Sequence, residues 1–259
     1  MATLKQKLLG GVTFLTLFDV SGAAAAPPAT PSWTGFYIGG HAGYSWGNVS
    51  GDTAHGVIPP VPPFSLVPGT SVFSIGRDVD PNGALGGIQA GYNFQAGQAV
   101  FGIEADFSWT GQRDTFNFNG HTIAFGEDFS YQETFAAKLK YLGTVRGRLG
   151  YAYGDFLPYI TGGVAWGRLS IDMNWREAQS IGINIPPFAT ATFAGSEAHT
   201  LVGWTLGAGF EYAFAKQWST KAEYLYVDLG DKTYFAGIQG GGSFGLQDHI
   251  VRIGINFRP

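Results

Sequence analysis

The clearest pattern in the chain lies at residues 141–151, where side chains alternate between the two sides of an extended strand. Val145 and Leu149 fall on one side, and Arg146 and Arg148 fall on the other. A short polar turn and a second run of strand-forming residues follow directly. The pattern predicts an antiparallel hairpin with one apolar face and one charged face.

The same alternation recurs along the whole chain, in segments separated by turn residues. We predict eight strands, at residues 33–46, 84–95, 99–110, 141–151, 157–166, 199–214, 218–228 and 248–257. Each is about as long as a tilted strand needs to be to cross a bilayer, roughly 9–11 residues. No helical pattern is present to cover an apolar sheet face, so we expect the apolar side chains to face lipid.

The connectors between these segments alternate in length. Short turns are expected around Ala96, Gly154 and Lys216. The long connectors cover residues 47–83, 111–130, 172–198 and 230–247. Short periplasmic turns and longer external loops are typical of outer-membrane barrels, whereas a soluble β-sandwich has no reason for the alternation. The prediction is an all-β fold, an eight-stranded antiparallel up-and-down transmembrane β-barrel.

Charged side chains occupy the inward positions of several predicted strands. These positions are Glu104, Asp106, Arg146, Arg148, Glu211, Lys221, Glu223 and Arg252. Acids and bases are equal in number, and an isolated buried charge costs several kcal/mol, so we expect pairing across the lumen. An eight-stranded barrel is narrow enough for side chains to fill. We therefore predict a closed lumen, with a narrow porin-like channel as the alternative.

Aromatic residues gather near the predicted strand ends. Such girdles mark the two membrane interfaces of an outer-membrane barrel. The predicted girdle residues are Trp33, Trp46, Trp109, Tyr151, Trp166 and Trp218.

Composition narrows the functional classes. The chain has no cysteine and a net charge of −4, which exclude thiol chemistry and argue against a nucleic-acid partner. The histidines lack zinc-motif spacing. An enzyme of this class would need a histidine with a serine or aspartate partner. His199 has Ser196 nearby in the sequence and His249 follows Asp248, but neighbouring residues of a strand point to opposite sides and so make poor partners. We predict no enzymatic activity, no cofactor, and neither catalytic nor metal-binding residues.

The N-terminal segment has the features of a secretory signal peptide. Lys5 and Lys7 precede a short apolar stretch, and small residues follow it. We predict a signal peptide at residues 1–25, a proline-rich lead-in at 26–32 and the barrel at 33–259. The mature protein should therefore begin near Ala26 and fractionate with the outer membrane. N-terminal sequencing that found Met1 retained in a cytosolic fraction would contradict this.

Several sequence motifs carry a family resemblance. They are WTGFYIGGHAGYSWG at 33–47, LGTVRGRLGYAYGDFLPYITGGVAWG at 142–167, KAEYLYVDLG at 221–230 and HIVRIGINF at 249–257. The chain resembles small OmpA/OmpX-like outer-membrane β-barrel proteins of Gram-negative bacteria, in particular the subgroup described as immunogenic, porin-like or hemin-binding. The resemblance implies the barrel fold, an outer-membrane location and a surface antigen. It also implies outer-membrane lipid and the barrel-insertion machinery as partners. We predict a structural, surface-exposed role in the cell envelope. Such barrels usually end on an aromatic residue, whereas this chain ends on Pro259.

The predicted long loops are unusually apolar. The segments at 57–64 and 183–188 are rich in isoleucine, proline and phenylalanine, and His55 and His121 are expected on the same side of the membrane. A cluster of exposed apolar side chains can mark a binding surface. Binding of hemin or a host surface molecule through the loops is therefore the alternative to a structural role.

Overall fold

The computed structural model describes residues 32–53, 55–57, 71–73, 79–124, 127–180, 189–237 and 241–259. The predicted signal peptide, nearly all of the lead-in and the apolar tips of the first and third long connectors lie outside these ranges. No helix in the described ranges is long and apolar enough to cross a membrane.

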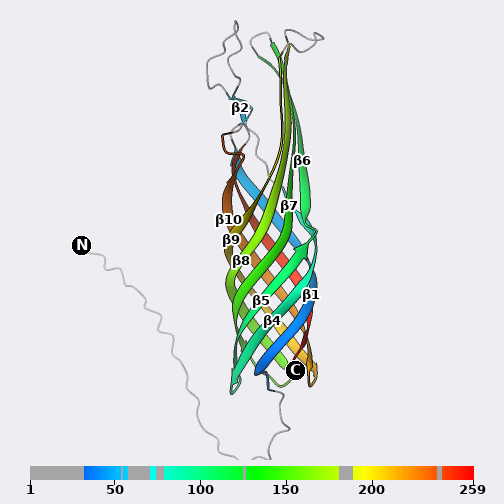
Figure 1. Cartoon of the computed structure of the whole chain (residues 1–259), viewed down its shortest axis with the longest axis vertical. Coiled ribbons are helices and arrows are strands. Elements are labelled where there is room, and N and C mark those ends of the chain that lie inside the picture. The colour runs from blue at the N-terminus through cyan, green and yellow to red at the C-terminus, as the bar shows by residue number, and fades with distance from the viewer. Residues whose placement is uncertain are drawn as a thin grey trace, which may run out of the picture. The chain divides into compact units, whose positions relative to one another are not determined.

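Eight antiparallel strands form a closed ring (Figure 1). In ring order they are β1 (Gly35–Thr53), β11 (Gly242–Phe257), β10 (Trp218–Tyr234), β9 (Ala189–Ala215), β8 (Phe156–Ser180), β7 (Glu127–Tyr151), β5 (Ala99–Thr110) and β4 (Asn82–Ala96). The sheet closes because β1 pairs with β11 on one side and with β4 on the other. The predicted eight-stranded up-and-down barrel is confirmed.

Three of the described strands lie outside the ring, and two of them have only three residues. β6 (Arg113–Ala124) continues from β5 after a two-residue break and pairs along its length with β7. β2 (His55–Val57) and β3 (Ser71–Phe73) pair only with each other.

The barrel wall is longer than the sequence pattern predicted. β7 and β8 have 25 residues each and β9 has 27, which corresponds to about 80–90 Å at roughly 3.3 Å per residue. Figure 1 shows β6, β7 and β8 continuing well beyond the end of β10. The expectation of long loops at 111–130 and 172–198 was therefore wrong for much of their length.

The two faces of the wall exchange character along β7. Nearer the short turns, apolar side chains face outward and charges face inward. Beyond that region Gln132 and Lys138 are exposed, whereas Phe135 is buried inside. The exchange coincides with a β-bulge between Leu139 and Leu142, which are both buried although they are three residues apart. The outer half of the wall is thus built like a water-soluble sheet, and this inverted pattern explains why it was mistaken for loops.

Candidate functional site

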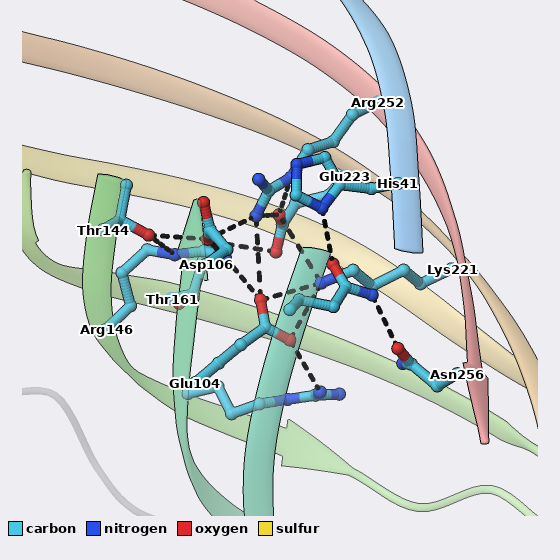
Figure 2. A network of polar contacts seen from close by, with 12 residues as sticks. His41, Glu104, Asp106, Thr144, Arg146, Thr161, Lys221, Glu223, Arg252 and Asn256 are labelled. Carbon is cyan, nitrogen blue, oxygen red and sulfur yellow. Dashed lines mark hydrogen bonds and ion pairs between the residues drawn. The ribbon is translucent and has the colours of Figure 1, made fainter. Parts of the chain in front are cut away.

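The eight predicted lumen charges all lie inside the barrel. None of their residues is more than 5% exposed. Strand alternation directs them inward from β5, β7, β9, β10 and β11, and Figure 2 shows most of them converging on one cluster. The structure therefore brings together side chains that are up to 148 residues apart in the numbering, from Glu104 to Arg252.

Glu104 is the centre of this network. Lys221 Nζ donates to both carboxylate oxygens, at 2.7 and 2.8 Å, and the Tyr37 hydroxyl donates to Oε2 at 2.8 Å. Arg146 Nη2 pairs with Oε1. Because β5 and β10 are not neighbours in the ring, the contact between Glu104 and Lys221 crosses the lumen.

Two arginines connect the remaining carboxylates of the cluster. Arg252 Nη2 lies 3.0 Å from Asp106 Oδ2 and 2.6 Å from Glu223 Oε2. Arg146 reaches the same two acids, with Nη2 2.9 Å from Asp106 Oδ2 and Nη1 3.0 Å from Glu223 Oε1. Both guanidinium groups thus bridge β5 and β10 through the barrel interior.

Arg148 and Glu211 form a second arm of the network. Arg148 Nη2 lies 2.8 Å from Glu211 Oε2, and its guanidinium carbon sits 4.1 Å from the centre of the Tyr159 ring. Ser219 and Asn256 donate to the other oxygen of Glu211, at 2.5 and 3.0 Å. The buried carboxylate is therefore well supplied with donors, as a charge in a low-dielectric site requires.

Uncharged polar residues that were not predicted as members complete the network. His41 contacts Ser108 Oγ through Nε2 at 2.7 Å and Gln89 Oε1 through Nδ1 at 3.2 Å. Gln89 Nε2 donates to Asn256 Oδ1 at 2.6 Å. Tyr159 Oη of β8 donates to Glu223 at 3.0 Å. Each of the eight ring strands therefore contributes at least one polar side chain to the network. The sequence could have identified these residues, because they occupy the same inward positions of the strand alternation as the charged ones.

Buried apolar side chains form a cluster inside the barrel beyond the charges, toward the long hairpins. This upper core includes Phe135, Leu139, Leu142, Leu169, Met173, Leu225, Val227, Phe244, Leu246 and Ile250. The sequence prediction missed it. Residues 224–227 of β10 could have indicated it, because apolar side chains occur there at successive positions. Both the outward and the inward face of the strand are therefore apolar at this level.

The prediction that Trp33 belongs to an interfacial girdle was wrong. Trp33 is 0% exposed and lies in a small apolar cluster near the short turns, where its Nε1 donates to the Gly154 carbonyl at 3.3 Å. The Arg258 guanidinium carbon lies 4.5 Å from the centre of its ring. Trp33 precedes β1, so the strand alternation does not direct its side chain.

The other five girdle residues take outward positions. Trp46, Trp109, Tyr151 and Trp218 are exposed. Trp166 also points outward but is partly buried, because its ring lies against Gly143 on β7. A Cβ at position 143 would clash with that ring. Their placement is that expected of residues near the two edges of an apolar band.

The candidate histidine pairs do not form. Asp248 is buried inside the barrel, whereas His249 faces outward and contacts the Tyr224 hydroxyl at 2.7 Å. His199 lies 3.3 Å from Glu197, on the side of β9 opposite to the exposed Ser196. Within the described ranges, no three acidic or histidine side chains come together as a metal site.

The hemin hypothesis receives no geometric support from the described residues. His121 is exposed on the outward side of β6, whereas Phe116 and Phe118 occupy the alternate positions of that strand. The side chain of His55 and the apolar loop tips lie outside the described residues. Ligand capture by the tips stays a prediction.

Comparison with known proteins identifies the family of this chain. Residues 15–258 match the family described as outer membrane protein beta-barrel domain. The 31 kDa outer-membrane immunogenic protein of Brucella melitensis is 35% identical over 93% of this chain and 89% of its own length. The 22 kDa outer membrane protein of Rhizobium leguminosarum bv. viciae is 28% identical over 91% and 83%. The crystal structure of OprG from Pseudomonas aeruginosa is similar over 87% of this chain and 97% of its own, with 14% identity and a TM-score of 0.42. The chain is an outer-membrane protein and belongs to the outer membrane protein β-barrel family.

Proposed function

We propose that this protein is a non-conducting structural barrel that supports the cell envelope and displays its long hairpins at the surface. The observation that carries the proposal is the buried network, in which four acids and four bases meet across the lumen. Because the acids and bases are equal in number, the network has no net charge that would attract a permeating ion.

The layers on either side of the network also support a closed interior. The upper core blocks the way toward the long hairpins, and the cluster around Trp33 narrows the end that carries the short turns. An ion would have to displace apolar side chains at both ends and break several ion pairs between them. Each step is costly in a medium of low dielectric constant.

The proposed assembly and activity follow from the same fold. Outer-membrane lipid would surround the apolar band, and the barrel-insertion machinery would recognise the end of β11, where Phe257 packs against Trp218 with ring centres 5.1 Å apart. The protein has no enzymatic role in the proposal.

Purified barrels reconstituted in a planar bilayer are expected to show no stable single-channel conductance. The matched comparison is Glu104→Gln, which removes one charge from the centre of the network without changing its size. Reproducible ohmic steps from the wild type, with an ion selectivity that changes in Glu104→Gln, would establish an open lumen and contradict the proposal. Conductance that is the same in both proteins would point to a contaminant, and a silent wild type supports closure.

A further inference from the structure

The outward side of β5, β6, β7 and β8 carries three kinds of side chain in successive tiers. The tiers begin at the aromatic band and continue along the extended wall, away from the short turns. We propose that this sector binds one phosphorylated glycolipid of the outer leaflet. The aromatic tier would contact its acyl chains, the next tier its phosphates, and the last tier its sugars. The proposal does not depend on whether the lumen conducts.

The first tier is an aromatic group at the top of the apolar band. Phe107 lies 5.2 Å from Trp109 and 5.4 Å from Tyr141, measured between ring centres. Trp166 of β8 lies against Gly143 in the adjoining part of β7. Rings of this kind sit at the level where acyl chains meet head groups.

The second tier is cationic and consists of Arg113, Lys138, Lys140 and Arg168. Arg113 is directly opposite Lys138 in the β6–β7 pairing, which puts their Cβ atoms roughly 5 Å apart. The β7 bulge allows Lys140 to be exposed immediately beside Tyr141. A cation thus adjoins the aromatic tier.

No member of the cationic tier forms an ion pair with another described residue. Asp172 is an acid exposed on the same side, and the cations outnumber it. Unpaired cations next to an aromatic band match the phosphates of a lipid head group, since each such cation strengthens binding to an anionic membrane surface.

The third tier is a grid of six polar side chains on β6, β7 and β8, and four of them carry an amide. Its two rows follow the strand register and read Asn117–Thr134–Asn174 and Asn119–Gln132–Arg176. They line a hollow of about 320 Å³. Thr134 Oγ1 donates to Asn117 Oδ1 at 2.9 Å, which orders part of the grid.

Strand stability does not account for the asparagines in this grid. Asparagine is depleted in β-strands, yet three of them take outward positions close together on two strands of this sector. Amide and guanidinium groups provide fixed sets of donors and acceptors that suit sugar hydroxyls. Gln132 is six residues beyond Lys138, about 20 Å along the strand, which is the space a sugar head group would occupy.

The order of the tiers identifies the class of ligand. A soluble sugar phosphate would need no aromatic tier, and a simple anionic phospholipid would not reach the amide grid. The long hairpins project to the external side of an outer-membrane barrel, so the ligand belongs to the outer leaflet. A single molecule with acyl chains, phosphates and sugars in that order accounts for all three tiers.

The test uses refolded full-length barrel in detergent and purified lipopolysaccharide as the probe. The charge variant is the triple substitution Arg113→Gln, Lys138→Gln and Lys140→Gln, and it is expected to weaken binding on the order of a hundredfold at low salt. Its control is the double substitution Lys216→Gln and Lys232→Gln, which removes cations away from the sector and should bind like the wild type.

The sugar tier is tested with Asn119→Thr and Gln132→Thr combined. Threonine favours strands, so this variant should fold at least as well as the wild type. It is expected to weaken binding of intact lipopolysaccharide and to leave binding of its sugar-free lipid portion unchanged. Thermal unfolding of every variant checks that the barrel is intact.

Three results would overturn the proposal. Equal affinity of the charge variant and its control would mean that the cations do not bind the lipid. Tight binding of the lipid-free saccharide, unaffected by the charge variant, would indicate a soluble glycan instead. If the amide variant binds intact lipopolysaccharide like the wild type, the third tier does not bind sugars and the sector recognises only the anionic lipid portion.

Discussion

Arg146→Ala is expected to lower the free energy of unfolding of the barrel by about 3–5 kcal/mol, the usual cost of removing one partner from a buried ion pair. Arg146 touches Glu104, Asp106 and Glu223, and its side chain is fully buried. Its removal leaves excess negative charge in a place that water does not reach. The guanidinium group also bridges strands on opposite sides of the lumen, so its loss weakens the barrel as a whole.

The measurement is urea unfolding of the barrel refolded into lipid vesicles. Lys232→Ala is the control, because Lys232 is an exposed cation beyond the lumen and its loss should change stability by no more than about 0.5 kcal/mol. Arg146→Lys should lie between the wild type and the alanine variant, since it keeps the charge but loses the planar fork that contacts several acids. Equal stability of Arg146→Ala and Lys232→Ala would show that the lumen is hydrated.

Ile253→Arg is expected to destabilise the inserted barrel by about 2–4 kcal/mol, the cost of arginine at mid-depth on a lipid-facing surface. Ile253 is 63% exposed on the outward side of β11, and it pairs with Ala42 and Ala222 on the neighbouring strands. Nothing polar is available at this depth to solvate a guanidinium group. Insertion should become slow or incomplete.

The matched control for this prediction is Gln247→Arg. Gln247 is exposed on the same side of the same strand but lies beyond Trp46 and His249, so arginine there should cost roughly 0–1 kcal/mol. Asn256, an inward residue of the same strand, cannot serve as the control because it is buried and hydrogen-bonded to Glu211 and Gln89. Equal insertion of Ile253→Arg and Gln247→Arg into vesicles would mean that Ile253 does not face lipid.

The sequence alone determined the number of ring strands and the facing of their membrane-spanning parts. An extended strand has a side-chain period of two, so each apolar residue at an alternate position predicts the direction of its neighbours. That is how Arg146 and Arg148 on β7 and Glu104 on β5 were identified as lumen residues. Their burial among opposite charges follows from closure of the ring, which the repeated apolar face and the alternation of short and long connectors predicted.

Only the tertiary structure decided which charges meet and how far the wall extends. The alternation predicts that Lys221 points inward. It does not predict that Lys221 meets Glu104, because that contact depends on the register of every strand between them. The bulge at Lys140 and Tyr141 reverses the facing of β7 beyond the membrane, which a strict period of two cannot anticipate. Trp33 lies before the first ring strand, so its burial depends on side chains from distant parts of the chain, such as Val100 and Leu157, that pack around it. Facing is a local property of a strand, whereas pairing, length and closure depend on contacts between residues distant in the sequence.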